Sequence, residues 1–149
     1  MPSPELQLYV DADFFSPYAF SAFVAVSEKG LPFELRPLDL AAGENLGADF
    51  AALSLTRRIP TLVHSDFALS ESSAIAEYLD EVFPAPPVFP REPRARARAR
   101  QVQAWLRTDL GTSSRTEGFF AAAPHILGIP IVFNLPAVVI TALVTWVLV

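Results

Sequence analysis

The stretch from Arg57 to Ser73 constrains the fold of this chain more than any other. It contains two short apolar runs, Thr61–His64 and Phe67–Ser70, joined by the turn-forming pair Ser65-Asp66. Residues suited to the first turn of a helix follow at once, in the order Glu71-Ser72-Ser73. This pattern predicts a β-hairpin that leads directly into an α-helix.

Pro60 marks the beginning of the first hairpin strand. Proline has no N–H group to donate to a sheet, so it belongs at the start or edge of a strand. A cis Ile59–Pro60 bond would turn the backbone groups of Ile59 outward, where the backbone of a ligand could pair with them. Most X-Pro bonds are trans, so the residue types alone favour the trans form. At the far end of the hairpin, the unpaired N–H groups of a helix N-terminus would donate hydrogen bonds to a carboxylate.

A strand, a loop and a helix are predicted before the hairpin. Residues Glu5–Asp11 alternate apolar with polar side chains, which is the period of a half-buried strand. Ser16 suits an N-cap, Pro17 a first helical residue and Gly30 a C-terminal stop. Helical spacing connects Phe20, Phe23, Val24 and Ser27. Ser16 is therefore expected at the hinge between strand and helix.

The next segments complete an alternating order of strands and helices. Phe33–Leu40 predicts a second strand, which Pro37 places at an edge or bulge. Ala41–Asn45 predicts a loop and Leu46–Leu55 a short helix. The helix after the hairpin has one apolar stripe, formed by Ile75, Leu79, Val82 and Phe83. The predicted order is β-α-β-α-β-β-α, with a right-handed crossover between the first two strands and an antiparallel hairpin at the sheet.

Pro84–Pro93 holds five prolines in ten residues and predicts a semi-rigid linker. Beyond it, alternating arginines and alanines favour a helix over residues 94–110, with Ala95, Ala99, Val102, Leu106 and Leu110 on one face. The arginines indicate a solvated face rather than a nucleic-acid site, because the chain has a net charge of −5.

The remaining composition excludes several classes of protein and site. The chain of 149 residues has no cysteine, so it has neither disulfides nor a thiol nucleophile. Its first residues lack the features of a secretory signal, and a cytoplasmic location is expected. Neither of its two histidines, His64 and His125, has a second metal-binding residue at ligand spacing, so no metal is predicted.

No charged residue follows Glu117, and Ile126–Val149 is an uncharged run of 24 residues. This length reaches the roughly 20 residues that cross a bilayer. Within it, Gly128-Ile129-Pro130 and Asn134–Ile140 resemble a membrane span of amino-acid permeases. A membrane-associated location through Ile126–Val149 is therefore the alternative to a cytoplasmic one.

Residues 1–83 resemble the glutathione-binding domain of the glutathione transferases. The resemblance depends on Ser16 at a strand-to-helix hinge, a β-branched residue before Pro60, and Leu69-Ser70-Glu71-Ser72 at the start of a helix. The helix through Gln101–Arg107 is similar to the first helix of the second domain in bacterial members with an active-site serine. The resemblance covers residues 1–110 of the 149.

The resemblance implies an α/β fold in which a thioredoxin-like β-α-β-α-β-β-α domain is followed by a truncated all-helical segment. The expected parts are the glutathione-binding domain at 1–83, the linker at 84–93, the first helix of the helical domain at 94–110 and an atypical apolar tail at 111–149. The implied partners are glutathione as co-substrate, a small electrophile and a second copy of the chain in a homodimer.

The resemblance also implies a role for each site residue. Ser16 would donate a hydrogen bond to the glutathione sulfur, because a free thiol, with a pKa of about 8.5, is mostly protonated at neutral pH. Ile59 would pair through its backbone with the cysteinyl part, and Pro60 would be the cis proline of the family. Phe14 and Phe15 would lie on either side of the sulfur as walls, and Arg58 would bind the glycyl carboxylate. Glu71 would bind the γ-glutamyl ammonium group, and Ser72 would bind the γ-glutamyl carboxylate.

Simpler structural roles explain some of the same residues. Ser16 before Pro17 is accounted for by helix capping, and Glu71-Ser72 by a first-turn acid and a cap. Arg57 departs from the family, which commonly has glycine or another small residue two positions before the residue preceding the proline.

Two functions are consistent with this pattern. The first is a glutathione transferase, which adds the thiolate to a small electrophile or reduces a peroxide. The alternative is a non-catalytic or membrane-tethered glutathione-binding module with a truncated or fused C-terminal domain.

Overall fold

The structure is a computed structural model in which residues 5–105 and 107 are described. The chain divides into two units, Met1–Val88 and Phe89–Val149. The predicted apolar tail and its permease-like span lie outside the described residues, as does His125. No helix in the described part of the chain combines the length and apolarity needed to cross a membrane.

A four-stranded sheet forms the centre of the first unit, in the order β2-β1-β3-β4. Its strands are β1 (Leu6–Asp11), β2 (Phe33–Leu38), β3 (Thr61–His64) and β4 (Phe67–Ser70). β1 pairs parallel with β2 and antiparallel with β3, which forms a hairpin with β4. The predicted strands, hairpin and edge position of Pro37 are therefore confirmed, although β2 ends two residues earlier than predicted.

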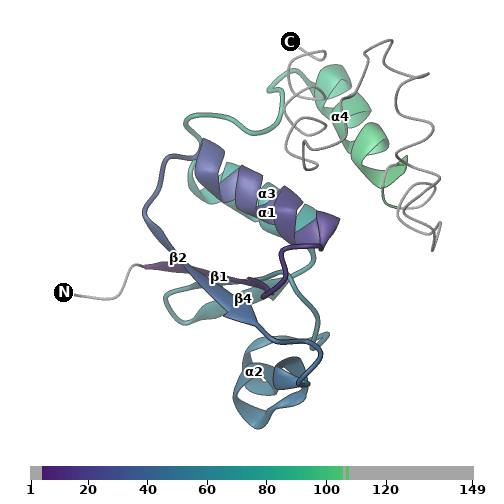
Figure 1. The fold of residues 1–149 in the computed structure, drawn as a ribbon. Coiled ribbons are helices and arrows are strands. Elements are labelled where there is room, and N and C mark those ends of the chain that lie inside the picture. The colour runs from purple at the N-terminus through teal and green to yellow at the C-terminus, as the bar shows by residue number, and fades with distance from the viewer. Residues whose placement is uncertain (1–4, 106, 108–149) are drawn as a thin grey trace. The chain divides into compact units, whose positions relative to one another are not determined.

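Helices cover both faces of this sheet. α1 (Pro17–Glu28) and α3 (Ser72–Val82) lie on one face, and α2 (Ala48–Leu53) lies on the other (Figure 1). The alternation of side chains along β1 explains why both faces of the sheet are covered. Leu6, Leu8 and Val10 are buried, and between them the ring centroid of Tyr9 lies 5.4 Å from that of Phe50 on α2. This arrangement confirms the thioredoxin-like α/β fold and its element order.

The ends of α1 are as predicted, but its buried face is not the one that the larger side chains suggested. Ser16 is the N-cap, Pro17 is the first helical residue, and Gly30 has a left-handed φ of 63° just after the helix. The buried positions are small residues, namely Ala19, Ala22, Ala25 and Val26. Small side chains allow α1 to approach the sheet and α3 closely, so the larger side chains of Phe20 and Phe23 remain half-buried at the side of the helix.

Two further predictions needed correction. The predicted helix Leu46–Leu55 is a short 3₁₀ turn, η1 (Glu44–Leu46), followed by α2, because Gly47 interrupts the two segments with an extended backbone. On α3, the apolar stripe is only half right: Ile75 and Leu79 are buried, whereas Val82 is 43% exposed. The charged residue Asp80 takes a buried place on this helix.

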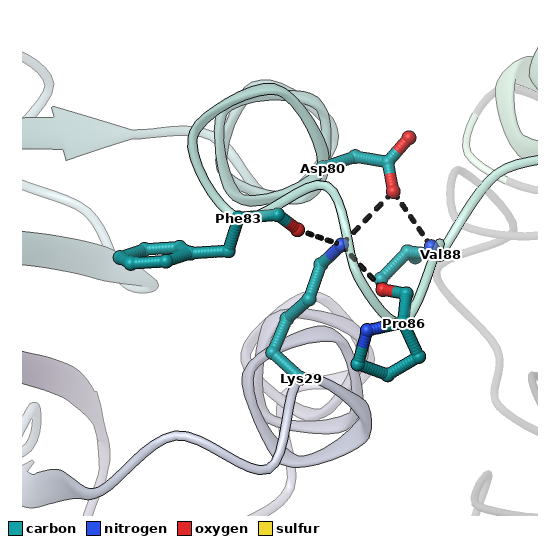
Figure 2. Close-up of polar contacts among 5 residues, drawn as sticks. All are labelled: Lys29, Asp80, Phe83, Pro86 and Val88. Carbon is teal, nitrogen blue, oxygen red and sulfur yellow. Dashed lines mark hydrogen bonds and ion pairs between the residues drawn. The ribbon is translucent and has the colours of Figure 1, made fainter.

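Asp80 is buried because it pairs with Lys29, the one lysine of the chain (Figure 2). The Lys29 Nζ donates to Asp80 Oδ1 at 3.0 Å, to the Phe83 carbonyl at 2.6 Å and to the Pro86 carbonyl at 2.7 Å. Asp80 Oδ1 also accepts a 2.6 Å hydrogen bond from the Val88 N–H. These contacts join the ends of α1 and α3 to the first residues of the proline-rich stretch.

The second unit contributes one described helix, α4 (Pro93–Trp105). Pro93 is its first residue, and the Glu92 carboxylate accepts hydrogen bonds from the N–H groups of Arg94 and Ala95 at 2.9 and 2.7 Å. These two bonds hold the pKa of Glu92 below its ordinary value. The arginine-rich segment is therefore helical up to Trp105, as predicted, and Ala99 is buried. Leu106 and Leu110 of the predicted apolar face lie outside the described residues.

Candidate functional site

The predicted site residues lie next to the ends of three strands, and these ends meet at one end of the sheet. Tyr9 of β1 pairs with Thr61 at the start of β3, and Thr61 pairs with Ser70 at the end of β4. The chain leaves β1 toward Ser16, enters β3 from Pro60, and leaves β4 into Glu71. The topology therefore places three separate segments of the predicted site at the same edge.

Ser16 caps α1, and its geometry leaves room for a second role. The Ser16 Oγ accepts a 3.2 Å hydrogen bond from the Ala19 N–H. A hydroxyl that accepts in this way still has its own proton to donate. The capping explanation for Ser16 is thus confirmed, and it is compatible with donation from the same hydroxyl to a bound group.

Asp11, which the sequence analysis did not single out, holds the loop before Ser16. Its Oδ2 accepts hydrogen bonds from the N–H groups of Phe15 at 2.6 Å and Ser16 at 3.1 Å. Its Oδ1 is buried and has no hydrogen-bond partner among the described residues. The available signal was its place at the end of a strand, next to the turn that leads to the helix.

Replacing Asp11 with alanine is expected to speed hydrogen exchange of the Phe15 and Ser16 amides by about tenfold or more. Hydrogen bonds to a charged group contribute about 1.5–3 kcal/mol, and a tenfold change corresponds to about 1.4 kcal/mol. Amide exchange measured by NMR tests this expectation. The matched control is Asp13→Ala, since Asp13 is exposed in the same loop. Equal exchange in the two variants would contradict the role of Asp11.

The Ile59–Pro60 bond is cis, as the resemblance implied and the residue types alone did not. The β1–β3 pairing ends at Thr61, and the Ile59 N–H and C=O have no partner among the described residues. Arg57 has a φ of 52°, a left-handed conformation that favours glycine. Glycine would adopt this conformation without strain, so Arg57 occupies a position to which glycine is better suited.

Glu71 and Ser72 open α3 in an unusual backbone conformation. Glu71 has a φ of 77° and is the N-cap, but its side chain makes no capping hydrogen bond. Ser72 is the first helical residue and is buried, so it follows the cap position. The explanation of this pair as a first-turn acid and a serine cap was therefore wrong. Non-glycine residues at positive φ concentrate at functional sites, where strain of about 1–3 kcal/mol persists.

The other predicted residues surround these three segments. Phe14 and Phe15 are 64% and 88% exposed in the loop before α1, and Phe14 has a φ of 55°. The Arg58 side chain is exposed, while its carbonyl accepts hydrogen bonds from buried hydroxyls. Of the four non-glycine residues with positive φ in the described residues, Phe14, Arg57 and Glu71 lie in the segments of the predicted site.

His64 has a structural explanation. Its Nδ1 lies 2.7 Å from the Tyr78 hydroxyl, and its Nε2 lies 3.3 Å from Glu5 Oε1. The described part of the chain contains no group of three or more His, Cys, Asp or Glu side chains that could hold a metal ion.

A family model matches the part of the chain that holds these segments. Residues 15–82 match the model described as the glutathione S-transferase N-terminal domain. Among curated proteins, human glutathione S-transferase theta-1 is 35% identical over 109 residues, which are 72% of this chain and 45% of that protein. Glutathione S-transferase 1 of Dianthus caryophyllus is 38% identical over 93 residues, 62% of this chain and 41% of that protein.

Solved structures agree with these matches. A glutathione transferase homologue from a Burkholderia strain, solved with bound glutathione, is 50% identical with a TM-score of 0.65, covering 80% of this chain and 66% of that one. Human glutathione transferase theta-2, in complex with glutathione, is 32% identical with a TM-score of 0.61, covering 68% and 41%. The chain spans less than half the length of the curated relatives it matches.

Proposed function

We propose that this chain, whose residues 15–82 match the glutathione S-transferase N-terminal domain model, belongs to that family, binds glutathione and transfers its thiolate to a small electrophile. The observation that carries the proposal is the convergence of Ser16, the cis Ile59–Pro60 bond and Glu71-Ser72 at one edge of the sheet. Relatives solved with bound glutathione support the same ligand.

The size of the ligand fits the spacing of the strands. Adjacent strands lie about 4.8 Å apart, so β1 and β4, on either side of β3, are separated by roughly 10 Å. An extended tripeptide also spans about 10 Å, at about 3.3–3.6 Å per residue. A glutathione molecule across the ends of these strands would therefore extend from the loop after β1, which leads to Ser16, to Glu71-Ser72 after β4.

Each part of the tripeptide has a complementary group. The Ser16 O–H would donate to the sulfur, and the unpaired backbone of Ile59 would bind the cysteinyl unit. The Glu71 carboxylate would bind the γ-glutamyl ammonium, and Ser72 at the N-terminus of α3 would hold the γ-glutamyl carboxylate. Arg58 would bind the glycyl carboxylate, and Phe15 would wall the sulfur.

The same thiolate would serve either conjugation to an electrophile or reduction of a peroxide. We propose a homodimer as the working assembly. The second candidate function is a glutathione-binding module without transferase activity. Binding without turnover of a model aryl halide would favour this second candidate.

The test of binding is a calorimetric titration of the full chain with glutathione. Replacing Glu71 with glutamine is expected to weaken binding about 10- to 100-fold, because a charged hydrogen bond of about 1.5–3 kcal/mol is lost. Asp66→Asn is the matched control, since Asp66 is an exposed acid in the turn of the hairpin. If the unmodified chain shows no binding at millimolar glutathione, the proposed function is wrong.

A further inference from the structure

Three hydroxyl groups form a buried cluster behind the proposed glutathione site. The side-chain oxygens of Ser54 and Ser70 lie 3.0 Å apart, and Thr61 Oγ1 lies 3.1 Å from each of them. Their residues are 2%, 8% and 0% exposed, in the order Ser54, Ser70, Thr61. We name these three side chains the hydroxyl cluster.

The hydroxyl cluster converges on one backbone carbonyl. Thr61 Oγ1 donates to the Arg58 carbonyl at 3.0 Å, and Ser54 Oγ donates to it at 3.3 Å. A carbonyl oxygen has two lone pairs, so it can accept both bonds. The Ser70 hydroxyl can then donate within the cluster, and every hydroxyl proton has an acceptor.

These bonds join both halves of the proposed site. Arg58 directly precedes Ile59, whose backbone would bind the cysteinyl unit. Ser70 directly precedes Glu71, which would bind the γ-glutamyl ammonium, and Ser54 is the C-cap of α2. The hydroxyl cluster thus ties the turn before Pro60 to the end of β4, on neighbouring strands.

A buried polar network of this kind costs free energy unless it is fully paired. Removing one partner leaves a buried donor or acceptor unsatisfied, at a cost of about 1–3 kcal/mol. Three apolar side chains would fill the same space without the risk of an unpaired polar group. A fully paired hydroxyl network, in contrast, holds the backbone segments that it joins in one fixed geometry.

We propose that the hydroxyl cluster positions the Ile59 backbone relative to Glu71-Ser72 and thereby sets the affinity for glutathione. This inference depends on the proposed function. Thr61, Ser54 and Ser70 would be positioning residues, because they act through the backbone and lie behind the ligand. The thiolate would be stabilised separately, by Ser16 at the N-cap of α1.

Replacing Thr61 with valine in the full chain tests the inference, because valine keeps the shape and removes the hydroxyl. The expected result is a rise of about tenfold in KM for glutathione, with kcat at saturating glutathione changed less than about twofold. The pH dependence of kcat should not move. Thr61→Ser, which restores the hydroxyl, is expected to recover most of the affinity.

Amide hydrogen exchange of the free protein gives a second readout that needs no activity. Thr61→Val is expected to speed exchange of the Arg57 amide, which donates to the Ser54 carbonyl at 3.2 Å, and of the Ile75 amide, which donates to the Glu71 carbonyl at 2.9 Å. Thr61→Ser is expected to leave both amides protected. Faster exchange at Arg57 alone would overturn the proposed positioning. A KM for glutathione that rises equally in Thr61→Val and Thr61→Ser would overturn it as well. Absence of glutathione binding by the unmodified chain would instead overturn the proposed function, and the exchange pattern would still decide the role of the hydroxyl cluster.

Discussion

Replacing Lys29 with methionine is expected to lower the free energy of unfolding of the first unit by about 3–5 kcal/mol. The Lys29 side chain is fully buried and the Asp80 side chain is 6% exposed, so the variant would leave a carboxylate buried without its counter-charge. The Phe83 and Pro86 carbonyls would each lose a hydrogen bond as well. A typical domain has only about 5–15 kcal/mol of stability, so the loss would be large.

The measurement is urea unfolding followed by circular dichroism, together with hydrogen exchange of the β1 amides. Tryptophan fluorescence would not follow this unit, because Trp105 and Trp146 both lie beyond Val88. Arg36→Met is the matched control: Arg36 pairs with Glu34 at 2.9 Å, with the two side chains 47% and 35% exposed. Its loss should cost about 1 kcal/mol or less. Similar losses in the two variants would contradict the importance of the buried pair.

Replacing Ser16 with alanine is expected to lower the rate of conjugation at neutral pH by roughly 10- to 100-fold. A hydrogen bond to a charged acceptor contributes about 1.5–3 kcal/mol, so its loss would raise the pKa of the bound thiol by about one to two units. Affinity for glutathione should change much less, because Glu71 and Ser72 would still hold the amino-acid end. Titration of thiolate absorbance in the complex measures the pKa shift directly.

Two further variants serve as controls for Ser16→Ala. Ser16→Ala also removes the bond to the Ala19 N–H, which is expected to cost about 1 kcal/mol of stability. Ser16→Thr retains a hydroxyl and should preserve both the cap and most of the activity. Ser27→Ala, an exposed position of α1, controls for the loss of a serine from this helix. An unchanged thiol pKa in Ser16→Ala would rule out the proposed donor.

Local patterns in the sequence predicted most of the first unit, because its elements are marked by short-range signals. The alternation in β1, the Ser16-Pro17 start of α1, the Ser65-Asp66 turn and the edge position of Pro37 all follow from neighbouring residues. The buried face of α1 did not, since close packing at a helix interface can select alanines in place of the larger apolar residues beside them. No periodicity reveals that choice.

The buried polar contacts of the first unit are long-range, and hydrophobic periodicity does not indicate them. Lys29 and Asp80 are 51 positions apart, and Ser54 and Ser70 are 16 apart. A lone lysine or serine is most often exposed, so nothing in the local sequence marks these as buried. The cis bond at Pro60 was accessible only through the resemblance to the family, because the residue types favour the trans form.

The attachment of Lys29 to Pro86, and of Asp80 to Val88, has a consequence for protein engineering. A chimera that joins the first unit to a different C-terminal segment needs a splice point after Val88, because a junction at Phe83 would discard two of the backbone groups that hydrogen-bond to the pair. First units of other proteins that lack an equivalent lysine and aspartate would tolerate a junction at the position of Phe83.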